Sequence, residues 1–176
     1  MNIFARILFV GCLGTGAALP CAAAGNEGSI HVELGYTQLS LSGDGFSLKP
    51  ANALVRIGYD ITGNFSAELV GTTSIASDSF QGASFKVDSG YGAFLKGQSE
   101  ILPNLELFAR AGWMRTTLTG SFMVRSASAS DSSFAYGVGV QYRFTKNWYG
   151  QMDYASYYDK GGDSIRGPSI SFGYRF

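Results

Sequence analysis

The stretch P-S-I-S-F-G-Y-R-F, residues 168–176, decides the fold class of this chain. Ile170, Phe172, Tyr174 and Phe176 alternate with serine, glycine and arginine, so an extended strand here has one apolar, aromatic face and one small or charged face. The chain ends on Phe176, whereas the last residues of soluble proteins are usually frayed and polar. This pattern predicts a strand that closes a membrane β-barrel.

The first 24 residues fit a secretory signal peptide. Arg6 is their only charge, an apolar stretch covers residues 7–19, and three alanines at 22–24 precede the expected cleavage site. The apolar stretch is too short and too rich in glycine for a good membrane-spanning helix. We therefore expect residues 1–24 to be removed and residues 25–176 to form the barrel domain. A lipoprotein is the weaker alternative, because neither Cys12 nor Cys21 follows a good lipobox.

The composition of the expected mature chain excludes several classes of protein. Removing Arg6 leaves 12 basic residues (13 − 1) against 13 acidic ones, so no basic excess points to nucleic acid. Both cysteines fall in the expected signal peptide, which leaves neither a disulfide framework nor a thiolate metal site. About 150 residues suffice for one domain. The 24 glycines and the many aromatic residues are typical of an all-β chain.

Alternation with a period of two marks eight strands. Tight turns at residues 62–64, 102–104 and 145–147 fall on one side and longer loops on the other, which is the layout of bacterial outer-membrane barrels. After Thr37 the apolar phase shifts to Leu39 and Leu41, which indicates a bulge or a strand leaving the bilayer. We predict an eight-stranded antiparallel transmembrane β-barrel in up-and-down meander order. Its strands are expected at residues 30–37, 53–60, 65–75, 87–96, 105–114, 134–144, 148–155 and 168–176.

A soluble lipocalin-like barrel has the same alternation but turns its apolar face inward. Three features favour the membrane barrel. The opposite face carries glycine, serine and balanced charge, which suit a narrow interior, and the terminal Phe176 has no obvious role in a soluble barrel. Aromatic residues also gather at the strand ends, as two interfacial girdles require. They are Tyr59, Phe65, Phe144, Trp148 and Phe176 near the tight turns, and Tyr36, Tyr91, Trp113 and Phe134 toward the loops.

The end of the chain, Gly173-Tyr174-Arg175-Phe176, resembles the terminal motif of the small eight-stranded outer-membrane β-barrel proteins of Gram-negative bacteria. This is the broad porin-like group that includes the OmpX/Ail type and the barrel of OmpA, and the resemblance covers essentially the whole mature chain. It implies residence in the outer membrane. It also implies that the last strand, with Tyr174 and Phe176, is read by the outer-membrane assembly machinery. Members differ in function, so the fold does not choose among them.

The face predicted to point inward carries both signs of charge. Around the turn at Gly63, Arg56 and Glu68 are expected to lie opposite each other or one diagonal step apart, and Lys96 and Glu106 likewise around Pro103. Buried charges need partners, so we expect a salt-bridged plug. A low-conductance ion path in which these pairs exchange partners is the alternative. The network comprises Glu33, Arg56, Asp60, Glu68, Lys96, Glu106, Arg110, Arg143, Asp153 and Arg175, with Asp88 on the same face.

Catalysis by this chain is not expected. Some small outer-membrane barrels modify lipid A with a histidine and a serine or an acid, but His31, the only histidine, lies near the periplasmic start of its strand. Its neighbours Ser29 and Glu33 share its face without building an activated nucleophile and an oxyanion hole. No metal-ligand cluster is visible in the sequence. We expect no cofactor.

The longer loops, at residues 42–50, 76–86, 119–132 and 159–163, are the remaining place for function, since loops on a rigid scaffold often carry recognition. Their charges are expected to contact solvent, outer-membrane lipids and lipopolysaccharide phosphates. Phe46, Phe80, Phe122 and Met123 are the candidates for contact with a host surface ligand. The expected function is a structural or adhesive surface role through these loops.

Overall fold

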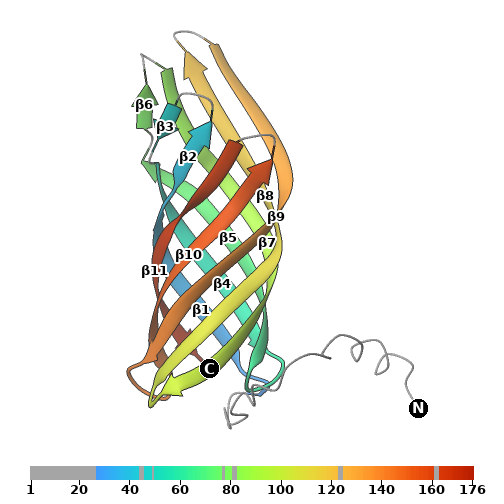
Figure 1. Ribbon diagram of the computed structural model, residues 1–176, viewed down its shortest axis with the longest axis vertical. Coiled ribbons are helices and arrows are strands. Elements are labelled where there is room, and N and C mark those ends of the chain that lie inside the picture. Colours follow the sequence, from blue (N-terminus) through green and yellow to red (C-terminus); the bar gives the residue numbers. More distant parts are fainter. Residues whose placement is uncertain are drawn as a thin grey trace, which may run out of the picture.

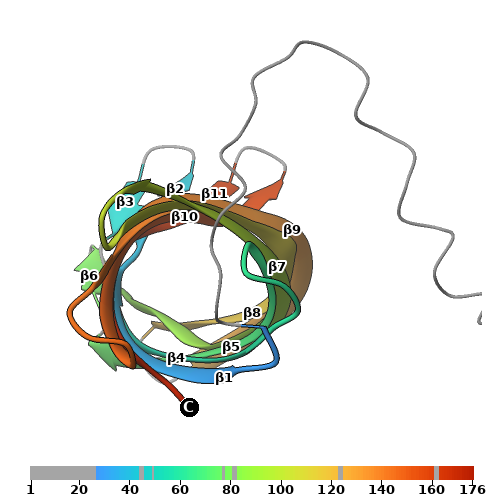
Figure 2. The ribbon, with the colours of Figure 1, turned by 90° about the horizontal axis from the view of Figure 1, so that it is seen from below.

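Antiparallel β-strands form one closed sheet around a central axis (Figures 1 and 2). The computed structural model describes residues 27–43, 46–48, 50–76, 78–80, 83–122, 125–160 and 163–176, so the expected signal peptide lies outside the described residues. Within these ranges no helix is long and apolar enough to cross a bilayer. The strands are β1 (Ile30–Gln38), β2 (Ser40–Gly43), β3 (Phe46–Leu48), β4 (Ala51–Asp60), β5 (Phe65–Ala76), β6 (Asp78–Phe80), β7 (Ala83–Leu102), β8 (Leu105–Phe122), β9 (Arg125–Arg143), β10 (Trp148–Lys160) and β11 (Asp163–Arg175).

These strands make eight staves of a barrel. β2 continues β1 after a break at Leu39, β3 precedes β4 in the next stave, and β6 extends β5. Each stave pairs with its neighbours in the sequence, and β1 closes the ring by pairing with β11 from His31–Arg175 to Thr37–Ser169. The predicted eight-stranded, antiparallel, all-β meander is therefore confirmed.

The apolar face of the strands points outward. On β5, Phe65 and Leu69 are exposed, while Ser66 and Glu68 between them are buried. The aromatic residues expected in the two girdles are all exposed on the outer surface. This distribution is the reverse of a lipocalin-like barrel. It fits a barrel whose outer surface contacts lipid.

The tight turns are built by local side-chain bonds. Thr62 Oγ1 accepts hydrogen bonds from the backbone N–H groups of Asn64 and Phe65, at 3.3 and 3.0 Å. Thr145 repeats this arrangement in the turn before Trp148. Between β7 and β8 the chain turns at Pro103-Asn104, and Asn104 has φ of 66°. Proline followed by a residue with positive φ is the pattern of a type II turn.

Strand pairing extends into all four expected loops. Gly43 pairs with Phe46 in the expected loop at 42–50, and Lys160 pairs with Asp163 in the expected loop at 159–163. The other two expected loops are largely strand. β8 and β9 remain paired from the barrel out to Phe122–Arg125, so most of the expected loop at 119–132 is a β-hairpin. β6 and β7 likewise pair within 78–85, inside the expected loop at 76–86. A transmembrane strand needs only about 9–11 residues, whereas β7, β8 and β9 contain 20, 18 and 19 residues. In Figure 1 the β8–β9 hairpin rises beyond the other strands, and β7 projects together with β6 beside it. The polar composition of these segments had indicated loops whose backbone groups bind water. In the structure their backbone N–H and C=O groups instead pair with the neighbouring strand.

The apolar phase shift after Thr37 coincides with a real break in the strand. Thr37 and Leu39 both lie in the interior, at 0% and 3% exposure. The N–H group of Leu39 donates to the carbonyl of Pro50 at 2.9 Å in the register of the β1–β4 ladder, and the ladder is interrupted here because Pro50 has no N–H group to donate in return. Leu39 is therefore an inward-facing apolar residue, and β2 resumes pairing with β11 directly above it.

Candidate functional site

Charged and amide side chains fill the part of the lumen that lies toward the tight turns. Nine of the ten predicted network residues are at most 5% exposed, and Arg143 is half-buried at the mouth, where 24% of its side chain is exposed. Asp88 lies in β7, and its side-chain position is outside the described set. Removing charges from water is costly unless they are paired. The geometry of the pairs therefore decides what this interior can do.

Glu33 on β1 and Arg56 on β4 form the first cluster. Arg56 Nη1 donates to Glu33 Oε2 at 3.1 Å, and Arg56 Nη2 reaches Asp153 Oδ1 on β10 at 3.4 Å. Glu33 Oε1 accepts from Tyr149 Oη at 3.0 Å and from Gln151 Nε2 at 2.7 Å. Both oxygens of this buried carboxylate thus have donors, which offsets its desolvation.

Asp60, on β4, contacts both the first strand, β1, and the last strand, β11, near the tight turns. Its Oδ2 atom lies 2.9 Å from Arg175 Nε on β11, and its Oδ1 atom lies 3.3 Å from His31 Nδ1 on β1. Gly58 makes room for the histidine, since a Cβ at that position would fall on the His31 imidazole ring. The small residues of the inner face therefore have a packing role beside the charged ones.

Glu68 is the centre of a second cluster. It lies 3.3 Å from Arg110 Nη1 and 3.8 Å from Lys96 Nζ. Lys96 also donates to Gln141 Oε1 at 2.9 Å. Both cations lie over the ring of Phe108, with Lys96 Nζ 4.6 Å and the Arg110 guanidinium carbon 4.7 Å from its centroid. Ion pairs, an amide and two cation–π contacts together hold these cations inside the barrel.

The two predicted diagonal pairs have different outcomes. The register places Glu68 opposite Gly58, one diagonal step from Arg56, as predicted, although Arg56 forms its ion pairs with Glu33 and Asp153. The prediction for Lys96 and Glu106 is wrong. Lys96 lies opposite Arg110, because β7 continues past it to Leu102 before turning. Glu106 instead pairs with Arg143 Nε at 3.3 Å and accepts from Gln141.

An apolar tier lies above the charged one, on the side of the long hairpins. Its members are buried and face inward: Leu39, Leu54, Val70, Phe94, Met114, Ala135, Ala155, Tyr157 and Ile165. A cavity of about 10 Å³ beside Leu39, Met114 and Tyr157 is at the lower limit of the space that one water molecule needs. This tier was not predicted from the sequence. Its signal was the phase shift to Leu39, together with large apolar residues such as Phe94 and Met114 on an otherwise small or charged face.

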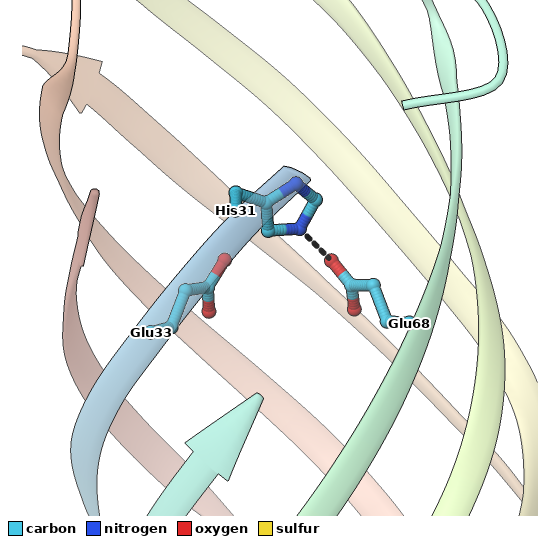
Figure 3. A group of neighbouring side chains, drawn as sticks. All are labelled: His31, Glu33 and Glu68. Carbon is cyan, nitrogen blue, oxygen red and sulfur yellow. Dashed lines mark ion pairs between the residues drawn. The ribbon is translucent and has the colours of Figure 1, made fainter. Parts of the chain in front are cut away.

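His31, Glu33 and Glu68 are the described residues whose geometry comes nearest to a metal site. One ligand atom from each lies within 4.8 Å of the others (Figure 3). The donor set fits a metal poorly, because both oxygens of Glu33 already accept hydrogen bonds from Tyr149, Gln151 and Arg56. Glu68 in turn is held by two cations. A structural zinc ion needs four free ligands, so these contacts favour an ion-pair network.

The same geometry describes what His31 can do chemically. Its Nε2 atom faces Glu68 Oε1 at 3.7 Å and its Nδ1 atom faces Asp60. Both ring nitrogens therefore address carboxylates, whereas nucleophilic catalysis needs a hydroxyl or thiol within reach of the base. His31 belongs to the charge network. That the chain is not an enzyme remains a prediction.

Three of the four candidate contact residues of the loops lie at the outer ends of the hairpins. Phe46 belongs to β3, Phe80 to β6 and Phe122 to the last position of β8, but their side-chain positions are outside the described set. Met123 lies outside the described residues altogether. The role of all four stays a prediction.

The terminal strand has one face in lipid and one in the network. Tyr174 packs edge-to-face against Trp148, with ring centroids 4.9 Å apart, and Phe176 is 71% exposed on the outer surface. Gly173 and Arg175 alternate with them and face inward, where Gly173 lies beside Tyr149. Of the two residues of the predicted assembly signal, Phe176 is thus exposed on the outer surface and Tyr174 is half-buried against Trp148.

Comparisons with solved structures place this fold among outer-membrane proteins. Ail, the attachment invasion locus protein of Yersinia pestis, aligns with a TM-score of 0.65 and 20% identity over 85% of this chain and 99% of its own. Neisserial surface protein A aligns with a TM-score of 0.63 and 15% identity over 85% and 98%. The N-terminal β-barrel of OprF from Pseudomonas aeruginosa gives 0.59 and 14% over 84% and 98%. At these identities the likeness shows the fold alone.

A family model extends the match to the sequence itself. No curated protein sequence matches the chain. The model of the outer membrane protein beta-barrel domain, however, matches residues 9–176. The inverted faces, the girdles and the structural likeness agree with that match, and they place the protein in the cell outer membrane. The chain belongs to the family of outer-membrane proteins built on this β-barrel domain.

Proposed function

We propose that this protein is a surface-binding barrel of the Ail/OmpX type, and that its binding element is the β8–β9 hairpin. The observation that carries the proposal is the length of that hairpin. Trp113 and Phe134, which belong to the outer girdle, lie opposite each other with ring centroids 5.3 Å apart. The ladder continues from Arg115–Ser132 to Phe122–Arg125, beyond the level of the bilayer.

The outer part of β9 offers an edge for strand addition. The ladder between β9 and β10 ends at Tyr136–Ser156, and in the described part of the chain Arg125–Ser130 pairs with β8 alone. An unpaired edge presents backbone N–H and C=O groups to a partner strand. Its sequence, R-S-A-S-A-S, contains no proline and one charge, which leaves the edge weakly protected. The partner that fits is an extended peptide segment of a host surface protein.

The charge of the outer segments supports a peptide over a polyanion. One Ail structure contains the heparin analogue sucrose octasulfate. In this chain the outer segments carry Lys86, Arg115, Arg125, Lys160 and Arg166 against Asp78, Asp131, Asp159 and Asp163, a nearly balanced set. Arg166 and Asp159 already lie 3.6 Å apart. Arg115, exposed two residues beyond Trp113, is placed to meet a lipopolysaccharide phosphate.

The alternative of an ion path has less support. Ions that entered the charged tier would have to cross the apolar tier around Leu54, Phe94 and Met114, where each is at most 4% exposed. Apolar constrictions of this kind exclude ions by dewetting. The contacts of the interior therefore favour a plug.

Shortening the hairpin tests the proposal. Thr117 and Ser130 are cross-strand partners with their hydroxyl oxygens 2.8 Å apart, so Asn-Gly can replace residues 118–129 and close the hairpin there. The matched control replaces residues 159–164 with Asn-Gly between the partners Tyr158 and Ile165. Adhesion of a non-adherent laboratory strain displaying each protein is measured on cultured epithelial cells. We expect the first variant to lose adhesion and the second to keep it.

Folding is monitored in both variants by the change of gel mobility on boiling. Equal adhesion by the full-length protein and a properly folded variant lacking residues 118–129 would contradict the proposal. Within the intact hairpin, Phe122→Ala with Met123→Ala tests the apolar tip separately. If adhesion and folding both survive that pair of substitutions, the tip residues are not contacts and the strand edge alone carries binding.

A further inference from the structure

The barrel seam, which we define as the ladder between β1 and β11, joins strands from opposite ends of the described chain. It extends from His31–Arg175 to Thr37–Ser169. The other neighbouring staves follow one another in the sequence. Closing a contact between distant chain segments costs more entropy than closing a hairpin, and this cost must be met by contacts that form on closure. The seam therefore needs more than its backbone ladder.

The first polar cluster supplies such contacts, since its bonds cross the seam. From the β1 side, Glu33 accepts from Tyr149 and Gln151 on β10, at 3.0 and 2.7 Å. From β4, Arg56 reaches Asp153 on β10 at 3.4 Å.

A hydrogen bond and an ion pair from β11 itself also cross the seam. Ser171 Oγ lies 3.4 Å from Glu33 Oε2, and Arg175 Nε lies 2.9 Å from Asp60 Oδ2. Glu33 and Arg56 bind each other at 3.1 Å. Glu33 on β1 and Arg56 on β4 therefore make the contacts that reach across the seam to β10.

We infer that the cluster around Glu33 and Arg56 is a lock on the seam: it sets how fast the barrel opens and closes between β1 and β11. An open seam separates Glu33 from Tyr149 and Gln151, and Arg56 from Asp153. Each separation leaves charged groups in a narrow interior with fewer partners, which is costly. The lock is independent of any ligand bound at the hairpins.

Glu106 provides a matched control. It is also 1% exposed, pairs with Arg143 and accepts from Gln141, but these partners lie on β9, which a hairpin joins to β8. Its bonds do not cross the seam. Glu33→Gln and Glu106→Gln thus each remove one buried carboxylate charge, the first with contacts across the seam and the second without.

The test measures the unfolding rate of the purified barrel in hot detergent, by the loss of its folded gel mobility. A disulfide between cysteines at Leu34 and Phe172, which lie directly opposite across the seam, holds it closed. A second disulfide at Leu107 and Val140 holds β8 to β9 instead. The full chain is expressed and the barrel is purified from the outer membrane. Residues 25–176 contain no native cysteine to interfere.

We expect Glu33→Gln to speed unfolding at least about tenfold, given the cost of breaking a buried pair. The seam disulfide should reduce that effect to within about twofold, because opening must then begin elsewhere. It should leave the effect of Glu106→Gln unchanged, and the β8–β9 disulfide should rescue neither variant. If the seam disulfide leaves the Glu33→Gln effect intact, or rescues both variants equally, the lock does not exist. Should Glu33→Gln fail to fold, Tyr149→Phe removes a single bond across the seam and is judged by the same disulfides.

Discussion

The ring of Tyr149 lies against Gly173 on the neighbouring strand, inside the barrel. The two residues are register partners on β10 and β11, and a Cβ at Gly173 would fall on the Cζ, Cε2 and Oη atoms of the tyrosine. Gly173 of the terminal motif is therefore required sterically, because a larger residue there would clash with the Tyr149 ring. It lets Tyr149 lie flat against the strand and donate to Glu33 at 3.0 Å.

Gly173→Ala should displace the Tyr149 ring and destabilise the barrel by about 1–3 kcal/mol, the usual cost of forcing extra volume into a packed interior. Urea unfolding in lipid vesicles measures the change. Gly71→Ala is the matched control, because a Cβ there meets nothing within 4 Å. Equal destabilisation by the two substitutions would contradict a steric clash between residue 173 and Tyr149. In a Tyr149→Ala background, Gly173→Ala should become nearly neutral.

The outward face of β5 tests the orientation of the wall. Leu69 is 64% exposed and lies between the two girdles. Leu69→Arg places a charge in hydrocarbon, which costs about 2–4 kcal/mol near the bilayer midplane. Leu69→Ala, measured by the same vesicle unfolding assay, separates lost packing from the charge. An arginine tolerated as well as alanine would indicate that this face is in water.

Phe176 should matter for assembly more than for stability. Its side chain is 71% exposed, and its backbone N–H donates to the carbonyl of Ile30 at 2.9 Å whatever the side chain is. Phe176→Ala is therefore expected to lower the amount of protein in the outer membrane while leaving the unfolding midpoint of the purified barrel nearly unchanged. Quantitative blotting of membrane fractions and urea unfolding provide the two readings. Normal assembly of the variant would remove Phe176 from the assembly signal.

Much of this fold could be read from alternation. A period of two assigns each side chain to one wall, so the faces of Phe65, Glu68 and Leu69 followed from their spacing. The aromatic residues at the strand ends then indicated that the apolar face contacts lipid. Composition was a poorer guide beyond the membrane. The serines and alanines of residues 126–130 suggested a loop, yet the ladder with β8 continues through them because paired backbones need no particular side chain.

The partners inside the lumen could not be read from the sequence. Contacts such as Arg56–Asp153 and Tyr149–Glu33 cross the lumen between non-adjacent strands, which come close only after the ring closes. Local diagonal spacing suggested a Lys96–Glu106 contact that the actual length of β7 excludes. Neutral members such as Gln141, which bridges Lys96 and Glu106, carry no charge pattern to mark them.

The central claim is that the barrel is closed to ions and that its function lies in the outer hairpins. Single-channel conductance tests this claim most directly. The purified protein, shown to be folded by its heat-dependent gel mobility, is inserted in a planar lipid bilayer. The apolar tier above the ion pairs predicts a folded barrel that shows no conductance steps. Reproducible small steps that change with Arg56→Ala or Glu68→Ala would contradict the account and make the interior charges an ion path.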